Sequence, residues 1–144
     1  MPGESFLVRG LNMLLFSVNV IVEEVRELKS GKGQINMILF SGFVDAPIFK
    51  GKILSGACDT QKYLKGERGE LSARYMLDGL DAEGTQTRLF IENNAYQTDD
   101  GIWKTTPRIF TDNEKLDWLE NVKLSGQIEG TDNGVIIHFY EDEK

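Results

Sequence analysis

The stretch LLFSVNVIVE, residues 14–23, decides the fold class because its apolar side chains recur at every second position. The series on one side consists of Leu14, Phe16, Val18, Val20 and Val22. Successive side chains of a β-strand point to opposite faces of a sheet, so this spacing predicts a strand with one apolar face. The apolar stretch is too short to span a bilayer, and Glu23 and Glu24 follow it where a signal peptide would carry small residues. We therefore expect a strand of a soluble, cytoplasmic protein that binds no membrane.

Similar segments follow along the chain and are separated by turn signals. We expect strands at 36–44, 51–59, 71–77, 87–93, 121–130 and 134–141, and a short strand beginning at Trp103. Turns or loops are expected at 30–33, 62–70 and 78–84. Asn133–Gly134 is a strong hairpin signal, because both residues tolerate positive φ. Gly42 lies inside a predicted strand, which indicates a bulge or a close approach of two backbones.

Only one segment is predicted to be helical, residues 112–119. The sequence TDNE at 111–114 matches a capping box, in which Thr111 accepts from the backbone N–H of Glu114 and Glu114 reaches back. Roughly seven to nine strands with one helix predict an all-β barrel or sandwich. Long sequential antiparallel strands favour a single closed or nearly closed barrel, because closure removes exposed edges. A barrel of about eight strands fills with side chains or holds one small ligand.

Size and charge narrow the classes of partner. The chain has 144 residues, so we expect a single domain, residues 1–144. Its net charge of -7 repels phosphate backbones, which argues against a nucleic-acid partner. The one cysteine, Cys58, cannot form an internal disulfide, and this fits a reducing compartment.

Four segments carry a family resemblance: GKILSGACD (51–59), LSARYML (71–77), LFIENNA (89–95) and PRIFTDNEKLDWL (107–119). In order and spacing the chain from Val18 to Tyr140 resembles a widespread bacterial and fungal family, the domain of unknown function numbered thirty-two thirty-seven. The resemblance implies a small calycin-like (lipocalin-like) β-barrel that often forms dimers or larger oligomers. It implies no established reaction.

The resemblance also suggests pocket residues. The matching positions are Asp59, Arg74, Tyr75, Asn93 and Trp118. The family pattern has Gly-Gly-Ala-Asp followed by an aromatic residue where this chain has the sequence SGACDT at 55–60. Cys58 is therefore a departure from the pattern or an insertion in it, which argues against a family-wide role for its thiol.

Asp59 and Arg74 are the chemically interesting pair. Arg74 could hold a ligand carboxylate in a bidentate fork, and Asp59 could act as a general base if burial raised its pKa. The alternative is a structural ion pair or two outward-facing charges. Period-two spacing does not decide between these, because it places Arg74 on the face opposite Tyr75 without saying which face is the interior.

The remaining candidates have weaker signals. Cys58 has no visible activating group, so we interpret it as a small buried apolar residue. Asn93 could donate its amide to a ligand or close a turn. Trp118 could form a pocket wall, although plugging one end of the barrel is the more favoured role. His138 is solitary, so no metal site and no cofactor are expected.

Three functions remain open. The first hypothesis is a binding module of unknown function whose partly polar cavity takes a small molecule, anionic if Arg74 contacts it. The second is an enzyme, an isomerase, cyclase or hydrolase acting on a small organic acid or ketone, with Asp59 as the base. The third is an interaction protein without a ligand, which works through its oligomer surface; a homo-oligomer is expected in any case.

Overall fold

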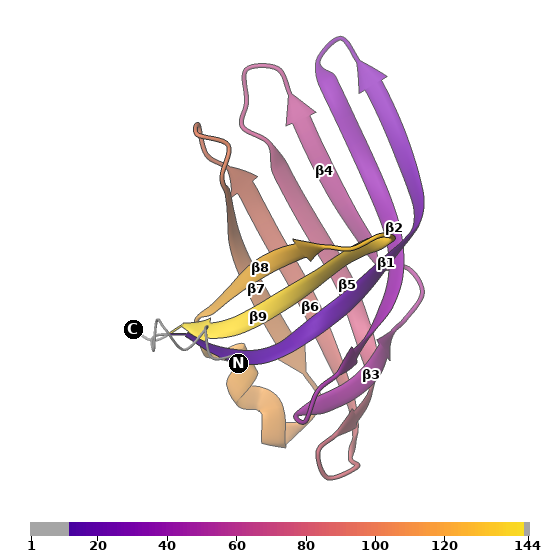
Figure 1. Ribbon diagram of the computed structural model, residues 1–144, viewed down its shortest axis with the longest axis vertical. Coiled ribbons are helices and arrows are strands. Elements are labelled where there is room, and N and C mark those ends of the chain that lie inside the picture. Colours follow the sequence, from indigo (N-terminus) through magenta and orange to yellow (C-terminus); the bar gives the residue numbers. More distant parts are fainter. Residues whose placement is uncertain (1–11, 143–144) are drawn as a thin grey trace.

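The computed structural model describes residues 12–142, which form one antiparallel sheet of nine strands and one short helix (Figure 1). The strands are β1 (Asn12–Ser30), β2 (Gly33–Asp45), β3 (Phe49–Ile53), β4 (Cys58–Leu64), β5 (Glu70–Asp81), β6 (Gln86–Gln97), β7 (Trp103–Thr111), β8 (Leu124–Gly130) and β9 (Gly134–Asp142). The helix is η1 (Glu114–Glu120). The strand order is β7-β6-β5-β3-β2-β1-β9-β8, and β4 pairs with β2 and β5. The predicted all-β class is confirmed.

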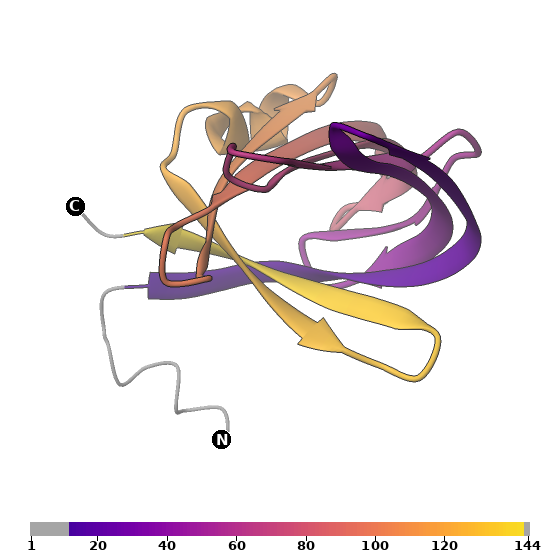
Figure 2. The ribbon, with the colours of Figure 1, turned by 90° about the horizontal axis from the view of Figure 1, so that it is seen from above.

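The sheet is strongly curved, so its two ends approach each other (Figure 2). The β8–β9 hairpin crosses over one face of the long strands β5, β6 and β7 (Figure 1). Between β7 and β8, the backbone N–H of Gly126 donates to Thr105 Oγ1 at 3.3 Å. We call the face that the sheet curls around the interior face and the other the outer face.

β3 and β4 share one place in the sheet, between β2 and β5. The prediction of a single strand at 51–59 is wrong, because a turn at 54–57 divides it. Gly56 has a φ of 100° in this turn, a conformation that a continuing strand does not use. The turn does not open the sheet, since the backbone N–H of Phe40 donates to the carbonyl of Ala57 at 3.2 Å. Residues 58–64 form β4, so residues 62–64 of the expected loop at 62–70 belong to a strand.

The apolar residues at every second position of the sequence are the ones that point to the interior face. Phe16, Val18 and Val20 of β1 are buried in the interior, where they pair with β9 and β2. The fully buried large side chains include Phe49, Leu77, Leu89, Ile91, Ile109 and Phe139. Burial of one such side chain contributes about 1.5–3 kcal/mol, so this cluster dominates the stability of the fold.

Gly42 is a point of close backbone approach, as predicted. Its φ is 152°, and a Cβ atom built there would lie 1.8 Å from the carbonyl oxygen of Asn19 on β1. Only glycine fits where the two strands meet this closely.

The helix is a 3₁₀ helix, and its N-cap differs from the prediction. Asn113, not Thr111, is the N-cap, and its side chain accepts from the backbone N–H of Lys115 at 2.9 Å. Leu116 and Leu119 are buried, so the helix covers part of the core. In the described part of the chain, no helix is long and apolar enough to cross a membrane.

Candidate functional site

Asp59 and Arg74 lie on opposite faces of the sheet. The β4–β5 register places Asp59 opposite Ala73 and Cys58 opposite Arg74, and residues directly opposite one another share a face. Asp59 therefore faces the interior with Ala73. The Arg74 side chain is 66% exposed on the outer face, with its Nε 3.2 Å from Glu92 Oε2. The expected link between Asp59 and Arg74 is wrong for this reason.

Three of the predicted site residues instead gather around Ala73. The registers place Asp59 on β4, Ala73 on β5 and Asn93 on β6 in one row across the interior face. Tyr75 is the next interior residue along β5 from Ala73. Asn93 and Tyr75 are 2% and 3% exposed, whereas Asp59 is half-buried. We call Asp59, Tyr75 and Asn93 the interior triad.

Each member of the interior triad has a buried polar atom without a protein partner. These atoms are Asp59 Oδ1, the Tyr75 hydroxyl oxygen and Asn93 Oδ1. A buried polar group that loses its hydrogen bond costs about 1–3 kcal/mol, and most such groups in proteins are satisfied by protein or water. This row is therefore the part of the described interior that is short of hydrogen-bond partners.

Burial also sets the protonation of the triad. Desolvation raises the pKa of Asp59, and the hydrogen bond from Gln61 opposes this shift. Complete burial raises the pKa of Tyr75 far above its usual value, so its hydroxyl stays neutral and keeps its proton. The site therefore combines a carboxyl group that is easier to protonate than usual with a neutral phenol.

A chain of side-chain amides leads along the interior face to Asp59. Gln34 Nε2 donates to Asn36 Oδ1 at 2.8 Å, and Asn36 Nδ2 donates to Gln61 Oε1 at 3.4 Å. Gln61 Nε2 then donates to Asp59 Oδ2 at 3.1 Å. The Tyr63 hydroxyl also donates to Gln61 Oε1, at 3.4 Å. The bonds run in one direction, and they occupy only one of the two carboxylate oxygens.

The amide chain was not predicted, although a signal for it exists in the sequence. Gln34 and Asn36 are two residues apart on β2, and Asp59, Gln61 and Tyr63 alternate in the same way on β4. Two polar series at period two on neighbouring strands indicate a shared polar face. Without the β2–β4 pairing, which joins Asn36 to Gln61, nothing connects them.

Asp59 lies where the polar and apolar halves of the interior face meet. Toward the β1–β2 turn, Gln34, Asn36 and Gln61 are half-buried and Tyr63 is 40% exposed, so solvent reaches this half. Toward the other end most of the interior side chains are buried and apolar. There the Phe40 ring packs edge-on against Tyr75, with ring centroids 5.2 Å apart.

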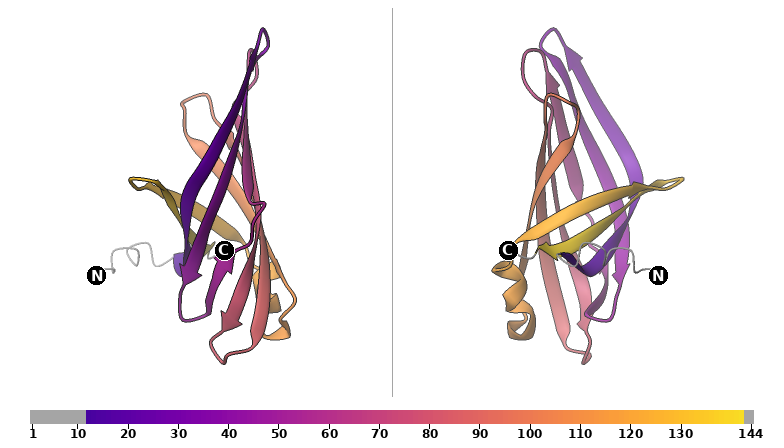
Figure 3. Two further views of the ribbon diagram at one scale, coloured as in Figure 1. Left: turned by 90° about the vertical axis from the view of Figure 1, so that its right-hand side faces the viewer. Right: turned by 60° about the vertical axis from the view of Figure 1, so that its left-hand side comes forward.

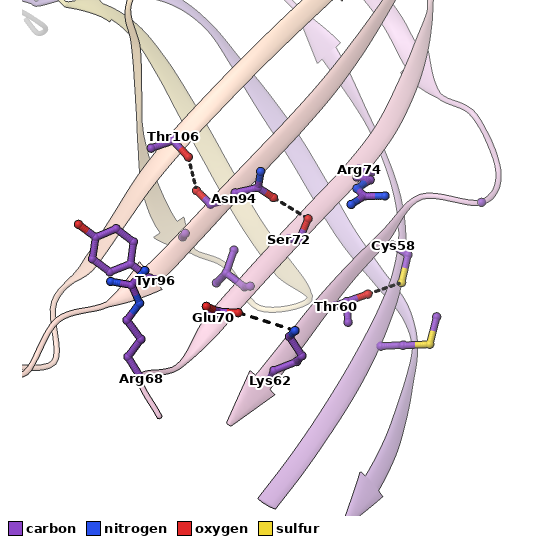
Figure 4. A pocket seen from close by; sticks show the side chains of 14 residues that line it. Cys58, Thr60, Lys62, Arg68, Glu70, Ser72, Arg74, Asn94, Tyr96 and Thr106 are labelled. Carbon is purple, nitrogen blue, oxygen red and sulfur yellow. Dashed lines mark hydrogen bonds and ion pairs between the residues drawn. The ribbon is translucent and has the colours of Figure 1, made fainter. Parts of the chain in front are cut away.

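The outer face carries an open depression of about 790 Å³ (Figure 4). Its polar lining includes Cys58, Thr60, Lys62, Arg68, Glu70, Ser72, Arg74, Asn94, Tyr96 and Thr106. Its volume is in the range of ligand sites. Its side chains are, however, largely engaged with one another. Ser72 donates to Asn94 at 2.6 Å, Lys62 pairs with Glu70 at 3.7 Å, and Arg68 lies 3.8 Å from the centre of the Tyr96 ring. The interior triad, whose buried polar atoms lack partners, is therefore the stronger candidate site.

Trp118 is not part of the triad. It lies on η1 and is 38% exposed, whereas Leu116 and Leu119 of the same helix are buried. The leucines thus make the core contacts that were favoured for Trp118. Its assignment to a ligand site stays a prediction. The other tryptophan, Trp103, packs edge-on against Tyr63 with ring centroids 6.4 Å apart.

His138 lies between a serine and a carboxylate. Its Nδ1 is 2.7 Å from Ser17 Oγ, and its Nε2 is 2.9 Å from Glu129 Oε1. In the register of the sheet, His138 lies opposite Ser17 of β1 on one side and Gln127 of β8 on the other. We interpret the trio as a structural link between β1, β9 and β8. Among residues 12–142, no cluster of three potential metal ligands occurs.

Comparisons with solved structures support the fold. A protein with unknown function from Clostridium acetobutylicum has a TM-score of 0.76 and 25% identity, and the match covers 92% of this chain and 99% of that one. A β-barrel-like protein from Acinetobacter baumannii has a TM-score of 0.67 and 19% identity, covering 90% and 94%. A structure described as an enzyme from Penicillium herquei has a TM-score of 0.71 and 17% identity, covering 92% and 93%.

No family model matches the sequence, and no curated protein matches it either. The structural neighbours show a β-barrel-like fold among proteins of unknown function. The resemblance to the numbered family stays a prediction.

Proposed function

We propose that the protein binds a small molecule in the interior of a nearly closed, calycin-like barrel, at the interior triad. The observation that carries this proposal is the set of three buried polar atoms without partners, on Asp59, Tyr75 and Asn93. A ligand that hydrogen-bonds to them removes a cost that the folded chain otherwise bears. The half-buried residues of the amide chain provide a solvent-reachable approach.

Native mass spectrometry of the purified protein tests this proposal. We expect a non-covalent adduct that is lost on denaturation and is weakened in Asp59→Asn and in Tyr75→Phe. Arg74→Gln is the matched control, because Arg74 is next to Tyr75 in sequence but faces outward. An adduct that survives the two interior substitutions and disappears in Arg74→Gln would move the site to the outer depression and contradict the proposal.

A second candidate function is catalysis with Asp59 as a general base. It is favoured by the raised pKa of Asp59, because a carboxylate with a higher pKa is a stronger base. In this candidate reaction the neutral Tyr75 hydroxyl donates to the carbonyl oxygen of a small ketone. One neighbour of this fold, from Penicillium herquei, is described as an enzyme. Isomerase, cyclase and hydrolase reactions are all compatible with one base and one donor.

The two candidates differ in one measurement. If the protein is an enzyme, Asp59→Asn abolishes turnover of a ketone substrate while the binding of that substrate stays measurable. Cys58→Ser is the control and keeps its activity, because the thiol faces outward. A wild-type protein that binds candidate ketones but turns none over would leave binding alone.

A further inference from the structure

The interior triad offers hydrogen-bond acceptors, and this restricts what it can bind. Asp59 Oδ1 and Asn93 Oδ1 are acceptor atoms when the carboxyl group is ionised. The Tyr75 hydroxyl can donate or accept. Two of the three unsatisfied atoms therefore require donors from the ligand.

The amide chain leaves Asp59 Oδ1 as a hydrogen-bond acceptor for a ligand. Gln61 presents its Nε2 to Asp59 Oδ2, because its Oε1 already accepts from Asn36 and Tyr63. The amide donors of Asn36 and Gln61 thus point along the chain toward Asp59. Asp59 Oδ1 is left over, on the same interior face as Asn93.

Among residues 12–142, no lysine or arginine forms an ion pair with Asp59. Arg74 faces outward and pairs with Glu92. In β1, the interior positions beyond Val25 are Glu27 and Lys29, which lie opposite Asn36 and Gln34. Both are exposed near the β1–β2 turn. An anionic group beside Asp59 would face a half-buried like charge, which disfavours its binding.

We propose that the ligand of the interior triad carries at least two hydrogen-bond donors, such as hydroxyl or amino groups, and no negative charge where it meets Asp59. This inference rests on the proposed function and makes it specific. It also removes the anionic ligand that was expected while Arg74 was placed beside Asp59. A polyhydroxylated neutral molecule or an amine fits the acceptors, whereas a carboxylate does not.

Three aromatic probes of similar size separate these chemistries. Resorcinol carries two hydroxyl donors, 1,3-dimethoxybenzene has only acceptor oxygens, and benzoate is an anion. Binding is followed in mildly alkaline buffer by the NMR shift of the Ala73 methyl group, which lies between Asp59 and Asn93. We expect resorcinol to bind about tenfold more tightly than either comparison probe, as one hydrogen bond to a charged acceptor implies.

Variants locate the interaction. Asp59→Asn and Tyr75→Phe keep the shape of the site and should each weaken resorcinol binding, by about tenfold for Asp59→Asn. Arg74→Gln should leave it unchanged. If benzoate or dimethoxybenzene shifts the Ala73 methyl group as strongly as resorcinol, the donor requirement is overturned while interior binding stands. If none of the probes shifts it, interior binding itself is overturned.

Discussion

Asp59 combines a half-buried position, one carboxylate oxygen with a hydrogen-bond partner and one without. The neighbouring residue Cys58 has the opposite orientation and different chemistry. Its sulfur lies on the outer face, 3.9 Å from Thr60 Oγ1, and the residue is half-buried. The two neighbouring side chains therefore lie on opposite faces of β4.

The pH dependence of stability should report on Asp59. Its folded pKa is raised, so the native state holds this proton more tightly than the unfolded chain. Its contribution to the free energy of unfolding should fall as pH rises from the ordinary value of about 3.9 through the folded pKa. Asp59→Asn lacks this loss, so it should gain stability relative to the wild type over that window, as measured by urea denaturation.

Asp45→Asn provides the control for this experiment, since the Asp45 side chain is 71% exposed. The difference in free energy of unfolding between Asp45→Asn and the wild type should not grow over the same pH range. If the free energy of unfolding of Asp59→Asn differs from that of the wild type by the same amount at every pH, burial does not raise the pKa of Asp59.

The thiol of Cys58 should react without disturbing the interior site. We expect iodoacetamide to alkylate the folded protein, because the half-buried thiol lines the outer depression. Resorcinol should shift the Ala73 methyl group equally before and after alkylation. Mass spectrometry and NMR measure the two results, and a thiol that reacts only in urea would contradict this placement.

At the scale of single residues, the sequence named Asp59, Tyr75 and Asn93 separately as pocket candidates, but it gave neither their grouping nor the orientation of Arg74. Alternation places Tyr75 and Arg74 on opposite faces, and only the burial of Tyr75 shows which face is the interior. Asp59 and Asn93 come together because β4 and β6 both flank β5. That adjacency depends on pairing across the sheet, which a local pattern does not contain.

At the scale of elements, η1 is tied to the sheet by one buried polar side chain, Asn113, in addition to its buried leucines. Asn113 accepts from Lys115, and its Nδ2 donates to Thr87 Oγ1 at 2.7 Å and Asp81 Oδ2 at 2.9 Å. Lys115 Nζ also lies 2.9 Å from Asp81 Oδ2. These contacts join the helix to the β5–β6 turn, so both elements depend on Asn113.

Substitution of Asn113 should therefore cost more than an ordinary surface change. Asn113→Ala removes the N-cap and leaves Thr87 without this bond, so we expect a loss of about 1–2 kcal/mol in the free energy of unfolding. The matched control is Asn121→Ala at the other end of the helix, where the cap contact is made by the backbone. Denaturant titration measures both, and equal effects would refute the special role of Asn113.

Gly42 should be intolerant of any side chain. Gly42→Ala puts a methyl group against the Asn19 carbonyl, at a φ that L-residues rarely adopt. We expect a loss of about 3 kcal/mol or more, among the larger effects of single substitutions. Gly130→Ala is the control, because a Cβ there meets no atom within 4 Å. Thermal unfolding of both variants compares them, and similar melting temperatures would disprove the close approach.

Strand positions were predicted better than strand ends. Period-two spacing located the strands of both hairpins near the chain ends, and Asn133–Gly134 located the turn between β8 and β9. It did not locate the turn at 54–57, because the residues on both sides continue to look like strand. The N-cap was also misplaced, since Asn113 gains its advantage from Thr87 and Asp81, which are distant in sequence.

At the scale of the whole molecule, the two halves of β1 differ in the number of strands with which they pair. β9 pairs with β1 only as far as Ile21, so from Glu23 to Ser30 β1 has a sheet partner on one side alone. The β1–β2 turn projects at this end of the molecule (Figure 3). Val25 and Leu28 are exposed along this segment, and Val22 is exposed just before it. The expected homo-oligomer stays a prediction, and native mass spectrometry also measures it.

Amide hydrogen exchange should distinguish the strands paired on both sides from the half of β1 that is paired on one side. In the monomer, amides of β5 and β6 near Leu77 and Leu89 should exchange most slowly, because these residues are fully buried between paired strands. Amides of β1 after Glu23 should exchange much faster. Strong protection of that segment would indicate that another chain covers it, and its loss on dilution would identify a second copy.

The length of the turn between β3 and β4 has a genetic consequence. Because successive strand residues face opposite sides, adding one codon between Leu54 and Ala57 shifts β4 by one position if the turn keeps its present length. Cys58 then stands where Asp59 stands now, and a thiol replaces the carboxylate beside Ala73. A single-codon insertion is thus a short evolutionary route to an interior thiol within an otherwise unchanged sheet.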